Sequence, residues 1–393
     1  MFAELLFIII LNNKKMNKLF IISSITLMLS FSAFSQTKNI DSAMQKNAAQ
    51  TLLTNKQANK LTIGMYGQVD YNEPEGKEKG TMDVHRMVLL LGYNFTDNVQ
   101  FLTEIEYEHV KEVFIEQAFL NYRVANNFNV KAGLMLVPMG IINEYHESTT
   151  FFGVERPSVD HDIVPTTWRE IGIGVSGKIK DVPLKYQAYI FNGFNSDNLR
   201  GKDGLRKGRQ KGAESVISSP TFSGKLDYYG VSGLRLGAST YFGRTQTALQ
   251  NEVSGATVGV FMIGFDARYV YKKFKARGQY ISTTINGAKE YNSLNNSDLG
   301  SKMYGWYLEA GYNVLSVKNV QKFFPFVRYE QYDTHAKTEG IPVNKAYNRE
   351  ILTTGINYDL ADGITVKADY QFKKNQLYNT KNNQFNAGIA FWF

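Results

Sequence analysis

The sequence of 393 residues contains no cysteine and only 8 prolines. Without Cys it cannot form disulfide bridges, thiolate metal sites or a cysteine nucleophile. Beyond the N-terminal region, no apolar run approaches the roughly 20 residues of a membrane-spanning helix, which excludes a helical multispan protein. The net charge is also modest, because the chain has 44 Lys and Arg and 36 Asp and Glu, which gives a formal charge of +8. The basic residues are spread along the chain, so the sequence does not indicate a nucleic-acid partner.

Aromatic residues and glycine are abundant instead, with 24 Tyr, 26 Phe and 33 Gly. Hydrophobic residues make up 43% of the chain, yet the mean hydropathy is −0.29. A chain that is rich in both aromatic and polar residues, with so little proline, favours an architecture built from strands.

The N-terminal residues are typical of export. Lys18 precedes an apolar stretch over 19–29, and Ala33 and Ser35 supply the small residues at −3 and −1 of a cleavage site. We therefore predict that residues 1–35 are a signal peptide that starts at Met16. Residues 36–60 are polar, so we expect a periplasmic N-terminal leader that is disordered or weakly helical, because nothing in them requires burial. The main domain then comprises residues 61–393.

Alternation of apolar and polar residues is the strongest pattern in this domain. From Ile364 to Phe372 every second residue is apolar, and the residues between them are polar. Such a period of two predicts half-buried strands. About sixteen strands are expected. Their ranges are 61–71, 81–94, 98–109, 112–124, 127–137, 168–179, 182–193, 220–230, 233–244, 256–271, 273–285, 302–315, 321–333, 348–359, 363–374 and 383–393.

The links between these strands alternate in length. Short links such as Thr96-Asp97 and Ala125-Asn126 alternate with longer ones, and the longest spans 138–167. This alternation is typical of a bacterial outer-membrane protein, with short periplasmic turns and long external loops. We predict an all-β, transmembrane, antiparallel β-barrel whose third external loop folds into the lumen. The aromatic strand that ends at Phe393 resembles the address read by the barrel-assembly machinery.

Sixteen strands would enclose an aqueous channel, so the residues that face inward decide its selectivity. Acidic residues Glu104, Glu106 and Glu108 form one row, and Arg86 should lie opposite Glu106 or Glu108. Basic residues on other walls would oppose them and create a transverse field. These pore-lining candidates are Arg86, Arg123, Arg268, Lys273, Lys275, Arg277 and Arg328.

Two external loops carry further candidates. In the third loop, Glu155, Asp160, His161 and Asp162 offer oxygen and nitrogen ligands, but we favour a salt-bridged loop over a cation site. The fourth loop has six basic residues between Arg200 and Lys211. They would gather anions at the mouth, bind the anionic lipopolysaccharide of the outer leaflet, or form a solvated tip.

Several segments resemble the phosphate-selective porin O and P family. They are the strand 117–123, the run KAGLMLVPMG at 131–140, TFFGVER at 150–156, WREIGIGVSG at 168–177 and AYIFNG at 188–193. The resemblance implies a sixteen-stranded homotrimeric porin in which the third loop narrows the channel and basic residues conduct anions, phosphate among them. By position it adds Arg156 and Arg169 to Arg86 as pore-basic residues. The loop 245–255 departs from the family pattern, because it has no Lys.

We therefore expect a passive, water-filled channel in the outer membrane for small hydrophilic solutes, with a weak to moderate preference for anions. Lipid and lipopolysaccharide would surround it. A fourteen-stranded transporter of hydrophobic compounds is an alternative, since the strand count can slip by two. A barrel hydrolase is supported least, because none of the five His has a Ser or Asp partner at a diagnostic spacing, and His85 should face lipid. We expect no catalytic residue, metal or cofactor.

Overall fold

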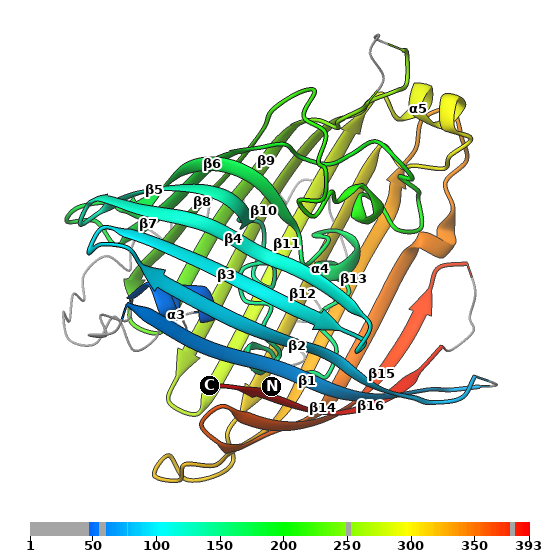
Figure 1. Cartoon of the computed structure of the whole chain (residues 1–393). Coiled ribbons are helices and arrows are strands. Elements are labelled where there is room, and N and C mark those ends of the chain that lie inside the picture. Colours follow the sequence, from blue (N-terminus) through cyan, green and yellow to red (C-terminus); the bar gives the residue numbers. More distant parts are fainter. Residues whose placement is uncertain (1–46, 55–59, 77, 249–252, 378–381) are drawn as a thin grey trace, which may run out of the picture. The chain divides into compact units, whose positions relative to one another are not determined.

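The computed structural model describes residues 47–54, 60–76, 78–248, 253–377 and 382–393. The predicted signal peptide, residues 1–35, lies outside the described residues. Sixteen strands form one closed barrel in which each strand pairs with its sequence neighbours and β1 pairs with β16 (Figure 1). Every pairing is antiparallel.

The strands run as follows: β1 Leu61–Pro74, β2 Thr81–Asn94, β3 Val99–Glu108, β4 Glu112–Ala125, β5 Phe128–Leu136, β6 Arg169–Lys178, β7 Leu184–Phe191, β8 Thr221–Val231, β9 Leu234–Arg244, β10 Gly259–Tyr271, β11 Phe274–Asn286, β12 Lys302–Tyr312, β13 Lys322–Lys337, β14 Asn348–Ala361, β15 Ile364–Asn375 and β16 Gln384–Trp392. The predicted barrel of about sixteen strands is confirmed. Each predicted strand overlaps its observed counterpart, and the differences are confined to the ends.

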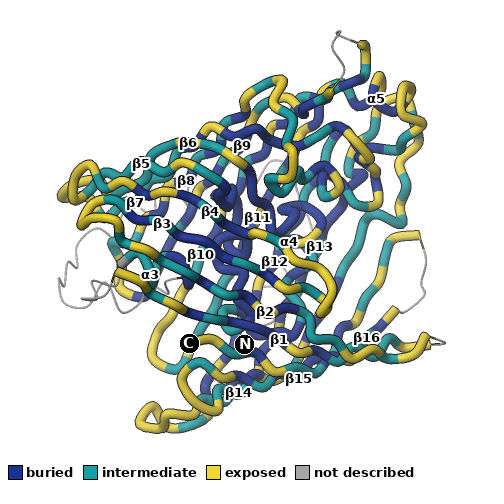
Figure 2. Tube along the Cα trace, viewed as in Figure 1, coloured by how far each residue is buried: buried dark blue, intermediate teal, exposed yellow. Residues whose placement is uncertain are grey.

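Strand β15 shows why this sequence closes into a barrel. Thr365, Lys367, Asp369 and Gln371 are buried, whereas Phe372 on the other face is 46% exposed. The polar face therefore points into the barrel and the apolar face points outward, which is the reverse of a soluble sandwich. Figure 2 shows the same alternation of buried and less buried positions along the other strands.

Two bulges interrupt the alternation on the wall formed by β1–β4. Between β3 and β4 the register shifts after Glu104, which leaves Glu116 as an extra residue that is 0% exposed. Between β1 and β2 it shifts between Gln68 and Asp70. The expectation that His85 faces lipid is wrong, because beside this second bulge its Nδ1 lies 3.6 Å from Oδ2 of the buried Asp70. A bulge shifts side-chain direction by one residue, which strict alternation does not anticipate.

Helices are few and short. Helix α3 (Ala48–Thr54) precedes β1 at the end of the barrel that carries the short turns, α4 (Val159–Asp162) lies between β5 and β6, and α5 (Ala288–Asn295) follows β11 (Figure 1). Three 3-10 turns complete the described elements: Ser148–Thr150, Arg206–Gly208 and Lys345–Tyr347. None of the helices within the described ranges has the length and hydrophobicity to cross a membrane.

Residues 36–46 and 55–59 of the predicted leader lie outside the described residues, but residues 47–54 include the helix α3, whose burial nothing in the sequence led us to expect. Ala48 and Ala49 are each only 7% exposed, and Leu52 packs against a cluster that includes Val88 and Leu90. The sequence did not predict this burial, because α3 is too short to show a repeating apolar face. Its partners are inner-wall side chains that are distant in the chain.

Candidate functional site

The candidate site is the lumen together with residues 137–168, which join β5 to β6 and which we call the inner segment. Figure 2 colours most of this segment as buried. Its backbone contacts wall residues from widely separated strands. Ile141 N donates to Gln279 Oε1 of β11 at 2.6 Å, and Val154 N donates to Asp369 Oδ2 of β15 at 2.7 Å. The segment therefore bonds to buried polar residues of the inner face.

Lysine side chains on the wall also hold the inner segment. Lys225 of β8 donates through Nζ to the carbonyl of Gly140 at 2.6 Å. Lys367 of β15 donates to three carbonyls, those of Ser148, Phe151 at 2.7 Å and Gly153 at 2.9 Å. An ammonium group has three N–H donors, so these bonds use the whole capacity of Lys367.

An acidic cluster lies on the wall formed by β1–β4. Arg86 is the Cα partner of Glu108, and its Nη2 lies 2.7 Å from carboxylate oxygens of both Glu106 and Glu116. The predicted position of Arg86 opposite Glu106 or Glu108 is confirmed. Sequence reasoning missed Glu116, which strict alternation would place on the apolar outer face. A carboxylate at such a position is costly in lipid, and that conflict was the available signal for a bulge.

His146 of the inner segment completes this cluster. Its Nε2 lies 3.2 Å from Glu116, 3.6 Å from Glu104 and 2.7 Å from the hydroxyl of Tyr66. Burial favours the neutral imidazole, but Glu116 and Glu104 outweigh it and raise the pKa of His146 to about 10. The inner segment is thus tied to the β1–β4 wall by a charged imidazole.

Ion pairs also neutralise much of the remaining wall. On the wall formed by β8 and β9, Lys225 lies 2.8 Å from Glu144 of the inner segment, and Arg235 lies 2.5 Å from Asp227. Glu309 of β12 forms ion pairs with Arg277 of β11 at 2.5 Å and with Arg328 of β13 at 3.2 Å. The predicted basic row is therefore not uniform. Arg277 is paired, Lys275 has no ion pair with any described residue, and Lys273 lies in the short turn before β11.

Five predicted basic residues lack such a partner among the described residues, namely Arg123, Arg156, Arg268, Lys273 and Lys275. No carboxylate of the described residues lies within ion-pair distance of Arg156, Arg268 or Lys275. The guanidinium of Arg268 lies 4.0 Å from the ring centroid of Tyr145, and Nζ of Lys275 lies 4.5 Å from that of Phe324. Burial, then the charge of Arg86, lowers the pKa of Arg156 below its ordinary value.

The other predicted residues occupy varied places. Arg169 is 2% exposed, donates to the Oγ1 of Thr167 at 3.2 Å, and lies 3.9 Å from Glu116. Arg123 and Glu108 are intermediate in exposure, and neither of them forms an ion pair with a described residue. The basic patch of the fourth loop turns inward in part: Arg206 and Arg209 donate to carbonyls of the inner segment, including Thr166 at 2.7 Å and Pro165 at 3.0 Å.

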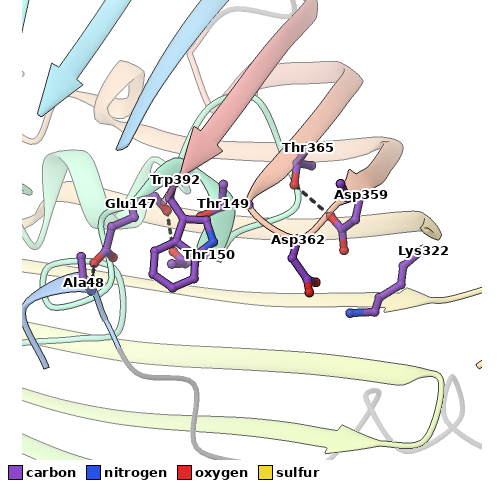
Figure 3. A pocket seen from close by; sticks show the side chains of 11 residues that line it. Ala48, Glu147, Thr149, Thr150, Lys322, Asp359, Asp362, Thr365 and Trp392 are labelled. Atoms are coloured by element: carbon purple, nitrogen blue, oxygen red, sulfur yellow. Dashed lines mark hydrogen bonds between the residues drawn. The ribbon is translucent and has the colours of Figure 1, made fainter. Parts of the chain in front are cut away.

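Helix α3 and the inner segment meet at the short-turn end of the lumen. Asn47 Nδ2 donates to the carbonyl of Glu144 at 2.5 Å, and the backbone N–H of Ala48 donates to the carboxylate of Glu147. Beside them a cavity of about 190 Å³ remains, lined also by Lys322, Asp359 and Asp362 (Figure 3). Figure 3 shows Lys322 across the cavity from Glu147 and Ala48.

Comparisons with known proteins agree with this architecture. The model of the phosphate-selective porin O and P family matches residues 60–390. An uncharacterised protein of Aquifex aeolicus (strain VF5) is 32% identical over 356 residues, which are 85% of this chain and 80% of that protein. Among solved structures, the outer-membrane channel DcaP of Acinetobacter baumannii has a TM-score of 0.58 at 12% identity, covering 85% of this chain and 97% of that one. An anion-selective porin from Comamonas acidovorans has a TM-score of 0.52 at 14% identity, with coverages of 85% and 99%.

Proposed function

The chain belongs to the phosphate-selective porin O and P family, and we propose that it is a passive, water-filled outer-membrane porin for small hydrophilic solutes with a modest preference for anions. Porins need no catalytic group, and the lumen has a polar wall of the kind that an aqueous channel requires. The trimer form recorded for OmpT of Vibrio cholerae, whose barrel has a TM-score of 0.52 to this one, supports a homotrimer.

The single observation that carries the anion preference is that basic side chains of the candidate site have no carboxylate partner among the described residues, whereas most of the acidic row is paired. Glu104, Glu106 and Glu116 are held by Arg86 and His146, and Glu309 is shared by two arginines. Arg156, Arg268 and Lys275 have no such carboxylate partner in the described part of the chain. We therefore expect a passing solute to meet these three basic side chains, whereas Glu104 and Glu106 of the acidic row are already paired.

Phosphate itself is a narrower proposal, supported by the family alone. Guanidinium groups suit the geometry of phosphate oxygens, and Arg156 and Arg268 are candidates for such contacts. Outer-membrane lipid, lipopolysaccharide and the assembly machinery remain proposed partners on the grounds given by the sequence.

Reversal potentials in a planar bilayer under a salt gradient test this proposal. We expect wild-type protein to favour anions, and Arg156→Glu, Arg268→Glu and Lys275→Glu each to shift the potential toward cations. At a distance of about 7 Å in a water-like medium, reversal of one charge changes the energy of a passing monovalent ion by about 1 kcal/mol, which is roughly fivefold in relative permeability.

Lys180→Glu is the matched control. Lys180 is an exposed residue of the short turn between β6 and β7, so the same change of charge occurs outside the lumen. Its potential should equal that of wild type. Cation selectivity of the wild type, or equal shifts from Lys180→Glu and the three lumen variants, would contradict the anion preference; absence of conductance would contradict the porin itself.

A further inference from the structure

A group of two imidazoles and one carboxylate lies at the rim of the barrel, away from the lumen contacts described above. Asp83 and His85 come from β2, and His109 is the first residue of the turn between β3 and β4. Each can offer one ligand atom, and these three atoms all lie within 4.8 Å of one another. We propose that Asp83, His85 and His109 bind a divalent transition-metal ion of the zinc type.

The local backbone brings the three side chains together. The N–H of His109 donates to the carbonyl of His85 at 3.2 Å, which fixes the turn against β2. The two imidazole rings are 5.4 Å apart between centroids and are inclined by 73°. Nδ1 of His109 already contacts Oδ2 of Asp83. Ligand atoms around a tetrahedral ion with bonds of about 2 Å would be roughly 3.3 Å apart, so a small closure would complete the set.

Ligand type selects the class of metal. Imidazole nitrogens favour Zn²⁺, Cu²⁺ and Ni²⁺, whereas Mg²⁺ and Ca²⁺ favour sets made only of oxygen. The side chains of Asp83, His85 and His109 are 30%, 23% and 47% exposed. An ion would therefore reach the site from solvent and keep a position for water, as three-ligand zinc sites do.

A second carboxylate supports His85. Oδ2 of Asp70 is 3.6 Å from Nδ1 of His85. Asp70 is 2% exposed, and both of its carboxylate oxygens accept hydrogen bonds from Gln68 Nε2, at 2.6 and 2.5 Å. Carboxylates behind ligating histidines orient the ring and increase its basicity, so Asp70 would serve as a positioning residue.

The other group of this kind, Glu104, Glu116 and His146, has a different character. It is fully buried, and Glu116 already binds Arg86 at 2.7 Å and His146 at 3.2 Å. A divalent ion would have to displace a guanidinium and a charged imidazole. No arginine of the described residues forms an ion pair with a member of the rim group, which is why the proposal concerns the rim alone.

Titration of the purified, folded barrel with Co²⁺ tests the proposal, because tetrahedral Co²⁺ gives visible absorption bands and Zn²⁺ can then displace it. We expect saturation at one equivalent per chain, loss of the bands in His109→Ala and in His85→Ala, and retention in His109→Cys, which restores a ligand. Asp70→Asn should weaken binding by about tenfold to a hundredfold without abolishing the bands.

His161→Ala is the matched control. His161 is 48% exposed and lies 2.6 Å from Asp162, but no second imidazole belongs to a metal-ligand group with it among the described residues. It should bind Co²⁺ as wild type does. Heat-dependent electrophoretic mobility would verify that each variant forms a barrel. Absence of saturable binding in wild type, or equal binding in the His85→Ala/His109→Ala double variant, would overturn the proposal, and neither result bears on conductance.

Discussion

Lys367→Met should release the inner segment from the β15 wall. The ammonium group of Lys367 is buried and donates to the carbonyls of Ser148, Phe151 and Gly153, and it lies 4.3 Å from the ring centroid of Phe151. Met fills a similar volume but donates nothing, so the three carbonyls lose their donor while packing on the wall is largely kept.

The contacts set the size of the effect. Hydrogen bonds to a charged group contribute roughly 1.5 to 3 kcal/mol each, so three contribute about 4 to 9 kcal/mol. Removal of the ammonium ion from water offsets several kcal/mol of this. A net loss of about 3 kcal/mol remains, which would raise the population of the undocked segment roughly a hundredfold.

Single-channel recording in planar bilayers measures this directly. We expect greater open-channel noise and an altered mean conductance in Lys367→Met. Lys374→Met is the matched control, because Lys374 lies on the same strand but is 63% exposed and pairs with Glu350 at 2.7 Å. If both variants conduct with the noise and conductance of wild type, the three hydrogen bonds do not hold the segment and the reasoning fails.

Three further outcomes are expected. Deletion of residues 47–54 should increase single-channel conductance, since α3 occupies the short-turn end of the lumen; unchanged conductance would show that the helix does not narrow the path. Because the folded-state pKa of His146 is raised to about 10, its stabilising contribution should be complete below about pH 6.5 and be lost as the pH rises through 10. Thermal denaturation across that range should show the loss in wild type and not in His146→Gln. Glu116→Gln leaves Arg86 with Glu106 alone and should lower the free energy of unfolding by about 2 kcal/mol in urea titrations, and an unchanged value would make Glu116 dispensable.

Much of the barrel could be predicted because its determinants are local. A period of two along each strand, and short links at every second position, are properties of contiguous residues. Both patterns can still be recognised when the predicted strand ends are wrong by a few residues. The facing of Arg86 toward Glu106 and Glu108 also followed from one short turn, since Thr96-Asp97 fixes the register of β2 against β3.

The rest depends on residues far apart in the chain. Glu116 reaches the acidic cluster through a bulge, and a bulge adds one residue without changing the hydrophobic pattern around it. Which cations stay unpaired depends on which carboxylates lie across the lumen: Arg277 is paired by Glu309 on β12, whereas Lys275, two residues earlier, has no carboxylate within ion-pair distance in the described ranges. Composition and alternation cannot distinguish these two residues.

The seat of α3 also constrains the order of assembly. The helix is synthesised before β1, yet its contacts include Glu144 and Glu147 of a segment that itself rests on β8, β11 and β15. Those partners come together only when the sheet has closed. The earliest part of the described chain is therefore among the last to find its place, and until then the short-turn entrance of the barrel lacks its helix.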